Sequence, residues 1–223
     1  MSKELIISTN PKGVTAEAIR TLRTNLQFTF VDKNIKTIMV TSSIPGEGKS
    51  FISANLAVSF GLIGFKVLLV DCDMRKGRQY KIFDFKDENV GLSNLLLDNI
   101  KNYKKYVKKT AYENVSVITS GIVPPNPSEL LGSNKNIELQ ELLKKEYDLI
   151  IIDSPPVNAV TDTLVLTSTV DEAVIVCAYK ETPIDLLEST KKALENTGVK
   201  IAGVVMNKMK SSKSKYYYGK YYK

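Results

Sequence analysis

Residues 35–50 read I-K-T-I-M-V-T-S-S-I-P-G-E-G-K-S, an apolar run that leads into a loop with two glycines. The run 35–42 predicts a buried strand, and the segment 50–63 behind the loop is long and apolar enough to predict a helix. Residues 66–70, K-V-L-L-V, predict a second strand. Strand, helix and strand in succession form a βαβ unit, so this stretch predicts an α/β fold.

The same alternation continues along the rest of the chain. Further strands are predicted at 115–119, 149–152, 173–178 and 201–206, and further helices near 136–146 and 184–197. These strands are continuously apolar, which is typical of parallel strands that are buried on both faces. We therefore expect one domain over residues 1–210, with a mostly parallel sheet covered by helices on both faces.

The loop after the first strand is S-I-P-G-E-G-K-S, residues 43–50. Gly46 and Gly48 allow the backbone to turn so that successive N–H groups point at phosphate oxygens. Lys49 would reach the β- and γ-phosphates of a nucleotide, and the Ser50 hydroxyl could bind Mg²⁺. Its place between strand and helix is that of a P-loop, although the first glycine of the usual pattern is a serine here. The alternative is a glycine-bearing turn without a ligand.

Acidic residues follow two of the predicted strands. Asp71 and Asp73 come directly after the second strand, and Asp153 follows the strand at 149–152. The carboxyl ends of parallel strands share one edge of the sheet, so these acids should converge on Lys49. Three carboxylates would repel a triphosphate unless Mg²⁺ lay between them, which predicts a magnesium site. The alternative for a single aspartate in such a place is a helix cap.

The composition excludes several kinds of site. The chain has 223 residues and no His, which excludes imidazole-based catalytic triads and most zinc sites. Cys72 and Cys177 lie in or beside apolar runs and form no C-x-x-C pair, so we expect reduced thiols in the cytoplasm. The sequence shows neither a signal peptide nor about 18 uninterrupted apolar residues, so we expect no transmembrane segment.

The positive charge is concentrated at the C-terminal end. The formal net charge is +7, but residues 208–223 contain six lysines and no acidic residue. The rest of the chain is therefore nearly neutral, and we expect no nucleic-acid partner. The low complexity of residues 211–223 predicts a disordered, flexible tail. Its five tyrosines are Tyr216, Tyr217, Tyr218, Tyr221 and Tyr222. One interpretation of this cluster is a segment that docks on a partner or stacks on bases.

Three segments together resemble the motifs of a known protein family. Residues 43–50, V-L-L-V-D-C-D-M-R-K at 67–76 and L-I-I-I-D-S-P-P at 149–156 are similar to the Walker A, A′ and B motifs of the bacterial tyrosine kinases that control capsular and extracellular polysaccharide synthesis. V-P-P-N-P-S-E-L-L at 123–131 resembles a loop of that family. The E-x-x-R-x-x-R element of the family is matched by Glu17, Arg20 and Arg23, in a helix predicted at about 14–30.

The resemblance implies an enzyme that uses ATP and Mg²⁺ to phosphorylate tyrosine. It implies that Asp71 is the base and that Ser50, Asp73 and Asp153 hold Mg²⁺, although the roles of the two A′ aspartates could be exchanged. Lys49 would act in catalysis as well as in binding. The implied nucleotide contacts are Gly46, Glu47, Gly48, Lys49, Ser50, Phe51 and Asn207. A plain strand-end turn is an alternative interpretation of Asn207.

The resemblance also implies an assembly and a set of partners. In the family, the element that Glu17, Arg20 and Arg23 match joins subunits into a ring. Each tyrosine tail then reaches the active site of the next subunit for autophosphorylation. A solvated salt bridge within the helix is the alternative for these three residues. Further expectations are a membrane-bound polysaccharide co-polymerase as activator, a phosphotyrosine phosphatase, and recruitment of a cytoplasmic enzyme to the inner face of the plasma membrane.

The competing interpretation is a partitioning or positioning ATPase that hydrolyses ATP without kinase activity. Such ATPases share the fold and the A′ motif, but usually carry a second lysine early in the P-loop. The aligned position here is Ile44, followed by Pro45. The missing lysine and the tyrosine cluster both favour the kinase.

Overall fold

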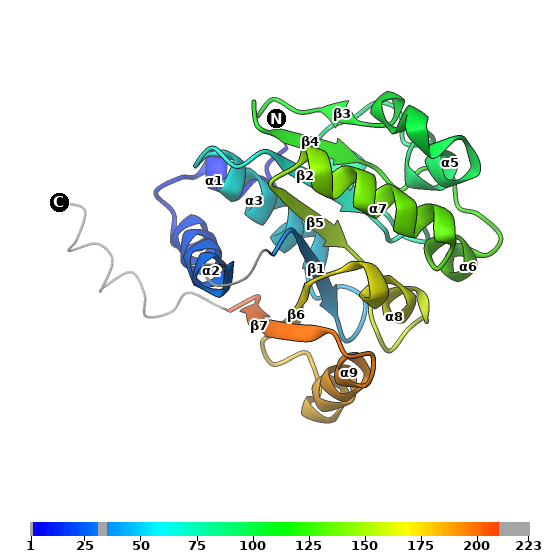
Figure 1. Ribbon diagram of the computed structural model, residues 1–223. Coiled ribbons are helices and arrows are strands. Elements are labelled where there is room, and N and C mark those ends of the chain that lie inside the picture. Colours follow the sequence, from blue (N-terminus) through cyan, green and yellow to red (C-terminus); the bar gives the residue numbers. More distant parts are fainter. Residues whose placement is uncertain (1, 31–34, 210–223) are drawn as a thin grey trace.

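Seven strands form a single sheet in the part of the chain that the structure describes, residues 2–30 and 35–209 of a computed structural model (Figure 1). The strand order is β3 (Lys108–Lys109), β4 (Val115–Ile118), β2 (Val67–Asp71), β5 (Leu149–Asp153), β1 (Thr37–Ser42), β6 (Glu172–Ala178) and β7 (Lys200–Asn207). All neighbours are parallel except β3, which is antiparallel to β4. The predicted α/β fold with a mostly parallel sheet is confirmed.

Helices cover both faces of this sheet (Figure 1). One face carries α1 (Ile6–Thr9), α2 (Val14–Phe30), α3 (Lys49–Gly61) and α4 (Gln79–Ile82). The other carries α5 (Leu92–Leu97), α6 (Pro127–Leu131), α7 (Asn134–Glu146), α8 (Asp162–Leu166) and α9 (Ile184–Asn196). Two short 3-10 helices, η1 (Ile100–Lys105) and η2 (Thr167–Thr169), complete the described elements.

The two hydrophobic cores follow from the alternation of side chains along the buried strands. In β1, Ile38 and Val40 pack with Phe60 of α3 on one face, whereas Met39 belongs to the core on the other. Every residue of β1 is buried, because strands and helices surround it on all sides. The helix that follows, α3, is buried almost all round beneath α2, which explains its lack of a polar face.

The two edges of the sheet differ from expectation. The strand β7 was expected to be buried on both faces, but Val204 and Met206 are 53% and 54% exposed, because β7 is an edge strand. At the opposite edge, the two-residue strand β3 was not predicted, since two lysines carry no apolar pattern. Both cysteines are buried and free, as expected.

Two sequence predictions concern other parts of the chain. The tyrosine-rich tail, residues 211–223, lies outside the described residues. Over residues 2–30 and 35–209, none of the helices combines the length and the apolar character needed to cross a bilayer.

Candidate nucleotide-binding site

The ends of three central strands bring the predicted site residues to one edge of the sheet. The P-loop follows β1, and Asp71 and Asp153 are the last residues of the adjacent strands β2 and β5. The two aspartates are register partners, and Asp153 also pairs with Val40 of β1. The expected convergence of these acids beside the P-loop is therefore what the parallel register produces.

The P-loop turns through two glycines with positive φ. Gly46 has φ +87° and Gly48 has φ +94°, a conformation that is unfavourable for residues with a Cβ atom. Gly48 lies directly before α3, so the N–H groups at the start of the helix open toward the loop. A Cβ atom at Gly48 would also lie 2.1 Å from Nδ2 of Asn207. This position therefore requires glycine for two independent reasons.

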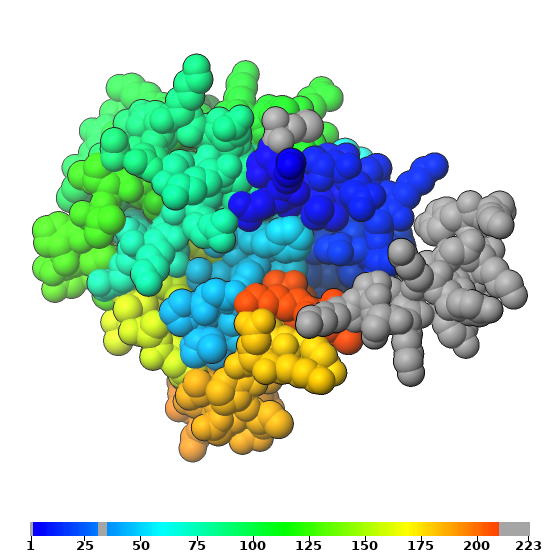
Figure 2. Space-filling view, turned by 180° about the vertical axis from the view of Figure 1, so that it is seen from behind, coloured from blue at the N-terminus to red at the C-terminus, as the bar shows by residue number. Residues whose placement is uncertain are grey.

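Contacts from two distant segments hold the P-loop in place. Glu47 is buried, and its carboxylate accepts hydrogen bonds from the Ile44 N–H at 2.8 Å and from the hydroxyl of Thr182, between β6 and α9. Asn207, the last residue of β7, donates its Nδ2 to the Glu47 carbonyl at 2.9 Å. Figure 2 shows the red end of β7 beside the light-blue P-loop segment. These contacts fix the shape of the P-loop.

Lys49 points into the cluster of acids. Its Nζ lies 2.9 Å from Oδ2 of Asp73, and both side chains are almost fully buried. Burial opposes the charged form of Lys49, but the carboxylates of Asp153 and Asp73 outweigh it and raise the pKa of the lysine. Lys49 therefore carries its positive charge where a polyphosphate would lie.

Asp71 is enclosed by the backbone of the segment that follows it. One of its carboxylate oxygens accepts the N–H of Asp73 at 3.2 Å, and the other accepts those of Arg78 and Gln79, each at 3.0 Å. Its side chain is fully buried. Burial, and then the negative charge of Asp153, raise the pKa of Asp71 well above its usual range.

Asp153 is equally buried and is held by side chains from two helices. Gln79 Nε2 donates to its Oδ2 at 2.8 Å, and Ser53 donates to its Oδ1 at 3.4 Å. Burial raises its pKa, while Lys49 and the hydroxyl of Ser50 oppose that shift. The side chain of Asp153 thus lies beside the start of α3.

The oxygen donors at this edge suit a magnesium ion that is shared with a nucleotide. In residues 2–30 and 35–209, no three His, Cys, Asp or Glu side chains form a cage that could hold a metal alone. Mg²⁺ usually binds through one or two protein oxygens, with phosphates and waters as its remaining ligands. Ser50, Asp73 and Asp153 fit that kind of site.

Two contacts at this edge were missed by sequence reasoning. Gln79 bonds to both Ser50 and Asp153, although nothing in its local sequence marks it. Arg75 donates two hydrogen bonds to the buried Asp162 at 2.9 and 3.2 Å, and Ser128 donates to the same carboxylate. These bonds join the A′ segment to the loop 123–131. Arg75 lies in the quoted A′ motif, which was the available signal.

The remaining predicted residues lie away from the cluster of acids, pack in the core or fall outside the described residues. Phe51 is partly buried and packs against the core around α3. On α2, Arg20 bonds to Glu17 at 2.9 Å, whereas Arg23 turns away to the Ser59 carbonyl at 3.1 Å on α3. The three residues of the E-x-x-R-x-x-R element therefore do not share one set of contacts. The five tail tyrosines lie outside the described residues.

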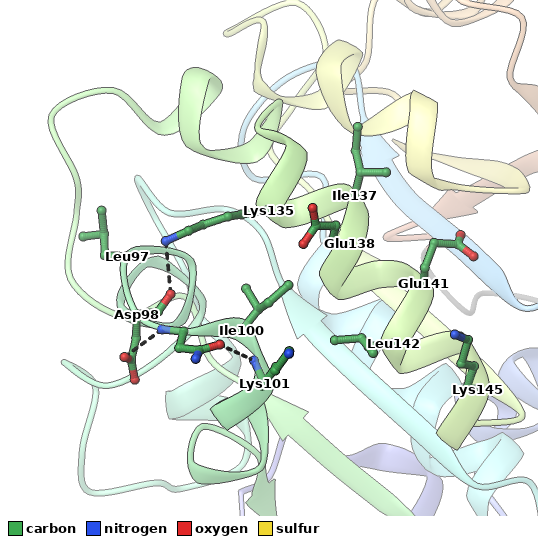
Figure 3. A pocket seen from close by; sticks show the side chains of 11 residues that line it. Leu97, Asp98, Ile100, Lys101, Lys135, Ile137, Glu138, Glu141, Leu142 and Lys145 are labelled. Carbon is green, nitrogen blue, oxygen red and sulfur yellow. Dashed lines mark hydrogen bonds between the residues drawn. The ribbon is translucent and has the colours of Figure 1, made fainter.

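A hollow also lies elsewhere in the described residues, between η1 and α7. It encloses about 800 Å³, with Leu97, Ile100 and Leu142 along its walls and Lys101, Lys135 and Lys145 around its rim (Figure 3). No predicted site residue lines it. The chemistry at the strand ends, rather than the size of a cavity, therefore identifies the nucleotide site.

Known proteins resemble this chain over most of its length. A family model described as an AAA domain (AAA_31) matches residues 35–200. The tyrosine-protein kinase YwqD of Bacillus subtilis (strain 168) is 41% identical over 221 residues, which are 98% of this chain and 92% of YwqD. The kinase domain of the Escherichia coli tyrosine kinase ETK superimposes with a TM-score of 0.85 and 32% identity, over 94% of this chain and 83% of that domain.

A partitioning-type ATPase is less similar. The septum site-determining protein MinD of Pyrococcus horikoshii OT3, solved with Mg-ADP, gives a TM-score of 0.66 at 27% identity. The match covers 80% of this chain and 72% of MinD. The likeness to kinases is thus closer and more complete than the likeness to this ATPase.

Proposed function

Since the chain belongs to the family of bacterial tyrosine-protein kinases of capsular and extracellular polysaccharide systems, we propose that it phosphorylates its own C-terminal tyrosines in trans. As a member of that family it is a P-loop protein-tyrosine kinase. The proposal concerns its substrate, its assembly and the roles of its residues. The carrying observation is the convergence of Lys49 with Asp71, Asp73 and Asp153 at one edge of the sheet.

Nucleotide binding would begin with an exchange of partners at Lys49. In the structure, the ammonium group is bonded to Asp73. The β- and γ-phosphates of ATP would replace Asp73 as the partners of this ammonium group. The N–H groups of Gly46 to Phe51 would bind phosphate oxygens. Asp73 would then be released from Lys49 and become available to the metal or to the substrate.

Ser50, Asp73 and Asp153 are the residues that we propose to hold Mg²⁺. The bound ion would neutralise charge on the phosphates and align the γ-phosphoryl group. The protein contributes fixed oxygen atoms: Asp153 is held by Gln79 and Ser53, and Ser50 stands at the first turn of α3. Asn207 would contact the base, and its hydrogen bond to Glu47 places it beside the P-loop.

A carboxylate must accept the tyrosine proton, because the chain contains no histidine. We propose Asp71, whose raised pKa brings it closer to the operating pH of a general base. Its oxygens are covered by the backbone of residues 73–79, so that segment must move before a tyrosine can reach it. Asp73 is the other candidate, and its release from Lys49 would expose it.

The tail tyrosines are proposed as substrates that reach the site of a neighbouring subunit. Glu17 and Arg20 form a half-exposed pair on α2, which leaves them accessible to a second chain. A ring built through these residues would place each tail beside another active site. Each phosphorylated tyrosine adds about −1.5 to −2 charges, which would oppose reassembly.

We further propose that the kinase works with a membrane-bound activator and regulates capsular or extracellular polysaccharide synthesis. A phosphotyrosine phosphatase would remove the phosphate groups from the tail tyrosines and allow reassembly. The activator would bring the kinase from the cytoplasm to the inner face of the plasma membrane. Membership of the family is what supports the proposal of these partners.

The test is incubation of the full chain with Mg-ATP, with and without the cytosolic segment of a candidate activator. Mass spectrometry of the C-terminal peptide should find phosphate between Tyr216 and Tyr222. Lys49→Met should abolish it, because the phosphates lose their only buried lysine contact at the P-loop. ATP hydrolysis with unmodified tyrosines, even with activator present, would contradict autophosphorylation.

A mixing experiment tests the trans step. One partner carries Lys49→Met and intact tyrosines, and the other is active but carries phenylalanine at all five tail positions. Phosphate on the tail of the inactive partner shows transfer between subunits. If the mixture stays unmodified while the wild-type chain modifies itself, transfer occurs within one chain.

A further inference from the structure

Gln79 touches all three nucleotide-binding motifs from a fully buried position at the start of α4. Its Nε2 donates to the Ser50 carbonyl at 3.1 Å in the P-loop helix and to Asp153 Oδ2 at 2.8 Å at the end of β5. Its backbone N–H donates to Asp71 Oδ2 at 3.0 Å. One side chain therefore sets the spacing between the elements that would surround a metal-bound nucleotide.

The neighbours of Gln79 fix which way its amide points. The Ser50 carbonyl can only accept a hydrogen bond, so the NH₂ end of the amide must face it, and the same end donates to Oδ2 of Asp153. Oε1, at the other end of the amide group, finds no donor among the residues that the structure describes. A buried carbonyl oxygen without a donor is costly, and such atoms in native proteins usually have a reason.

We propose that Gln79 is a positioning residue for the Mg²⁺ ion that binds with the nucleotide. Its NH₂ end holds Asp153 and the first turn of α3 at a fixed separation. Its Oε1 would be available to accept a hydrogen bond from one of the several waters that Mg²⁺ keeps when it binds. This inference rests on the proposed function only in that a Mg-nucleotide binds at this edge. Outer contacts of this kind typically change metal affinity by about 10- to 100-fold when they are removed.

The chain offers a matched control at Gln140. This glutamine is also buried, at 1% exposure, and both polar atoms of its side chain lack partners among the described residues. It lies on α7, on the face of the sheet opposite α3 and α4, and its side chain makes no hydrogen bond to the three motifs within the described residues. Gln140→Leu removes the same atoms as Gln79→Leu, but from a place where they should not influence nucleotide binding.

The experiment measures how strongly Mg²⁺ tightens ADP binding. Isothermal titration calorimetry on the full chain gives the ADP dissociation constant with saturating Mg²⁺ and with EDTA, and their ratio is the Mg²⁺ effect. We expect Gln79→Leu to reduce this ratio by about 10-fold or more. The affinity in EDTA should stay close to that of the wild type. Gln140→Leu should keep the wild-type ratio. Gln79→Met, which is unbranched, replaces the leucine variant if that variant does not fold.

The outcomes separate this inference from the kinase proposal. An unchanged ratio in Gln79→Leu or Gln79→Met overturns the role of Gln79, whether or not the tail is phosphorylated. Equal losses with Mg²⁺ and with EDTA also overturn it, because they indicate a general distortion of the site. A wild-type chain that binds ADP without any Mg²⁺ effect overturns both this inference and the proposed metal site. A normal Mg²⁺ effect that depends on Gln79, without tyrosine phosphorylation, supports the inference while contradicting autophosphorylation.

Discussion

Replacing Gly48 by alanine tests the packing of the P-loop against the end of β7. The new Cβ would meet two separate obstacles. The first is the backbone, because φ is +94° at this position. The second is Asn207, whose Nδ2 would lie 2.1 Å from the added atom. The side chain of Asn207 must move away, and its hydrogen bond to the Glu47 carbonyl is then lost.

The expected cost follows from these two contributions. A left-handed conformation costs an L-residue about 1–2 kcal/mol. The loss of the hydrogen bond adds about 0.5–1.5 kcal/mol. Gly48→Ala should therefore lower the free energy of unfolding by about 1.5–3.5 kcal/mol. Urea denaturation of the nucleotide-free protein measures this change.

Two further variants separate the contributions. Gly64 has φ +92°, but an added Cβ would meet nothing within 4 Å, so Gly64→Ala should show the backbone cost alone. Asn207→Ala should cost about 0.5–1.5 kcal/mol in the wild type. In the Gly48→Ala background it should cost almost nothing, because the bond is already broken.

The double-mutant cycle decides whether this reasoning is correct. Residues in contact are expected to show non-additive effects. If Gly48→Ala and Asn207→Ala add to within about 0.3–0.5 kcal/mol, the two residues are not coupled as the structure shows them. Equal costs for Gly48→Ala and Gly64→Ala would likewise refute the clash with Asn207.

Three further outcomes are expected. Burial raises the pKa values of Asp71 and Asp153, so the folded nucleotide-free chain binds more protons than the unfolded chain from about pH 4 up to the raised values. Its free energy of unfolding should fall as pH rises through that window, and Asp153→Asn should flatten the fall in a urea series; an unchanged slope would contradict the burial argument. Arg20→Ala should reduce the size of the oligomer in analytical ultracentrifugation while costing less than about 1 kcal/mol in stability, whereas Lys191→Ala, which breaks a similar pair on α9, should leave the assembly intact. Mg-ATP should dissociate the wild-type oligomer but not a variant with phenylalanine at the five tyrosines of the tail; dissociation of both would show that tail charge is not the cause.

The local motifs predicted most of the architecture and the composition of the site. A buried strand, a glycine loop, an apolar helix and a second strand are neighbours in the chain, so residues 35–70 were sufficient to predict the first βαβ unit. The sequence predicted that Asp71 and Asp153 lie close together, because both follow parallel strands. The register of β2 and β5 pairs them directly. Their burial and raised pKa values follow from the central position of β2 and β5 in the sheet.

The edges of the sheet were predicted less well for a physical reason. The run 201–206 is as apolar as the central strands, yet β7 has a neighbour on one side only. The exposure of a strand depends on its place in the sheet, and the sequence of one segment does not determine that place. The strand β3 was missed because its two lysines pair with β4 through backbone atoms, which leave no pattern in the side chains.

The partners of the site residues were decided by the tertiary structure. Asn207 and Glu47 are distant in sequence, and they meet because β7 ends beside the loop that follows β1. Gln79 follows an ordinary-looking turn, and it became important only when α4 placed it between Ser50 and Asp153. A sequence motif specifies which chemical groups occur at the end of a strand. Which groups touch one another depends on strand order, register and helix packing, because these bring together side chains from segments that have no local relation.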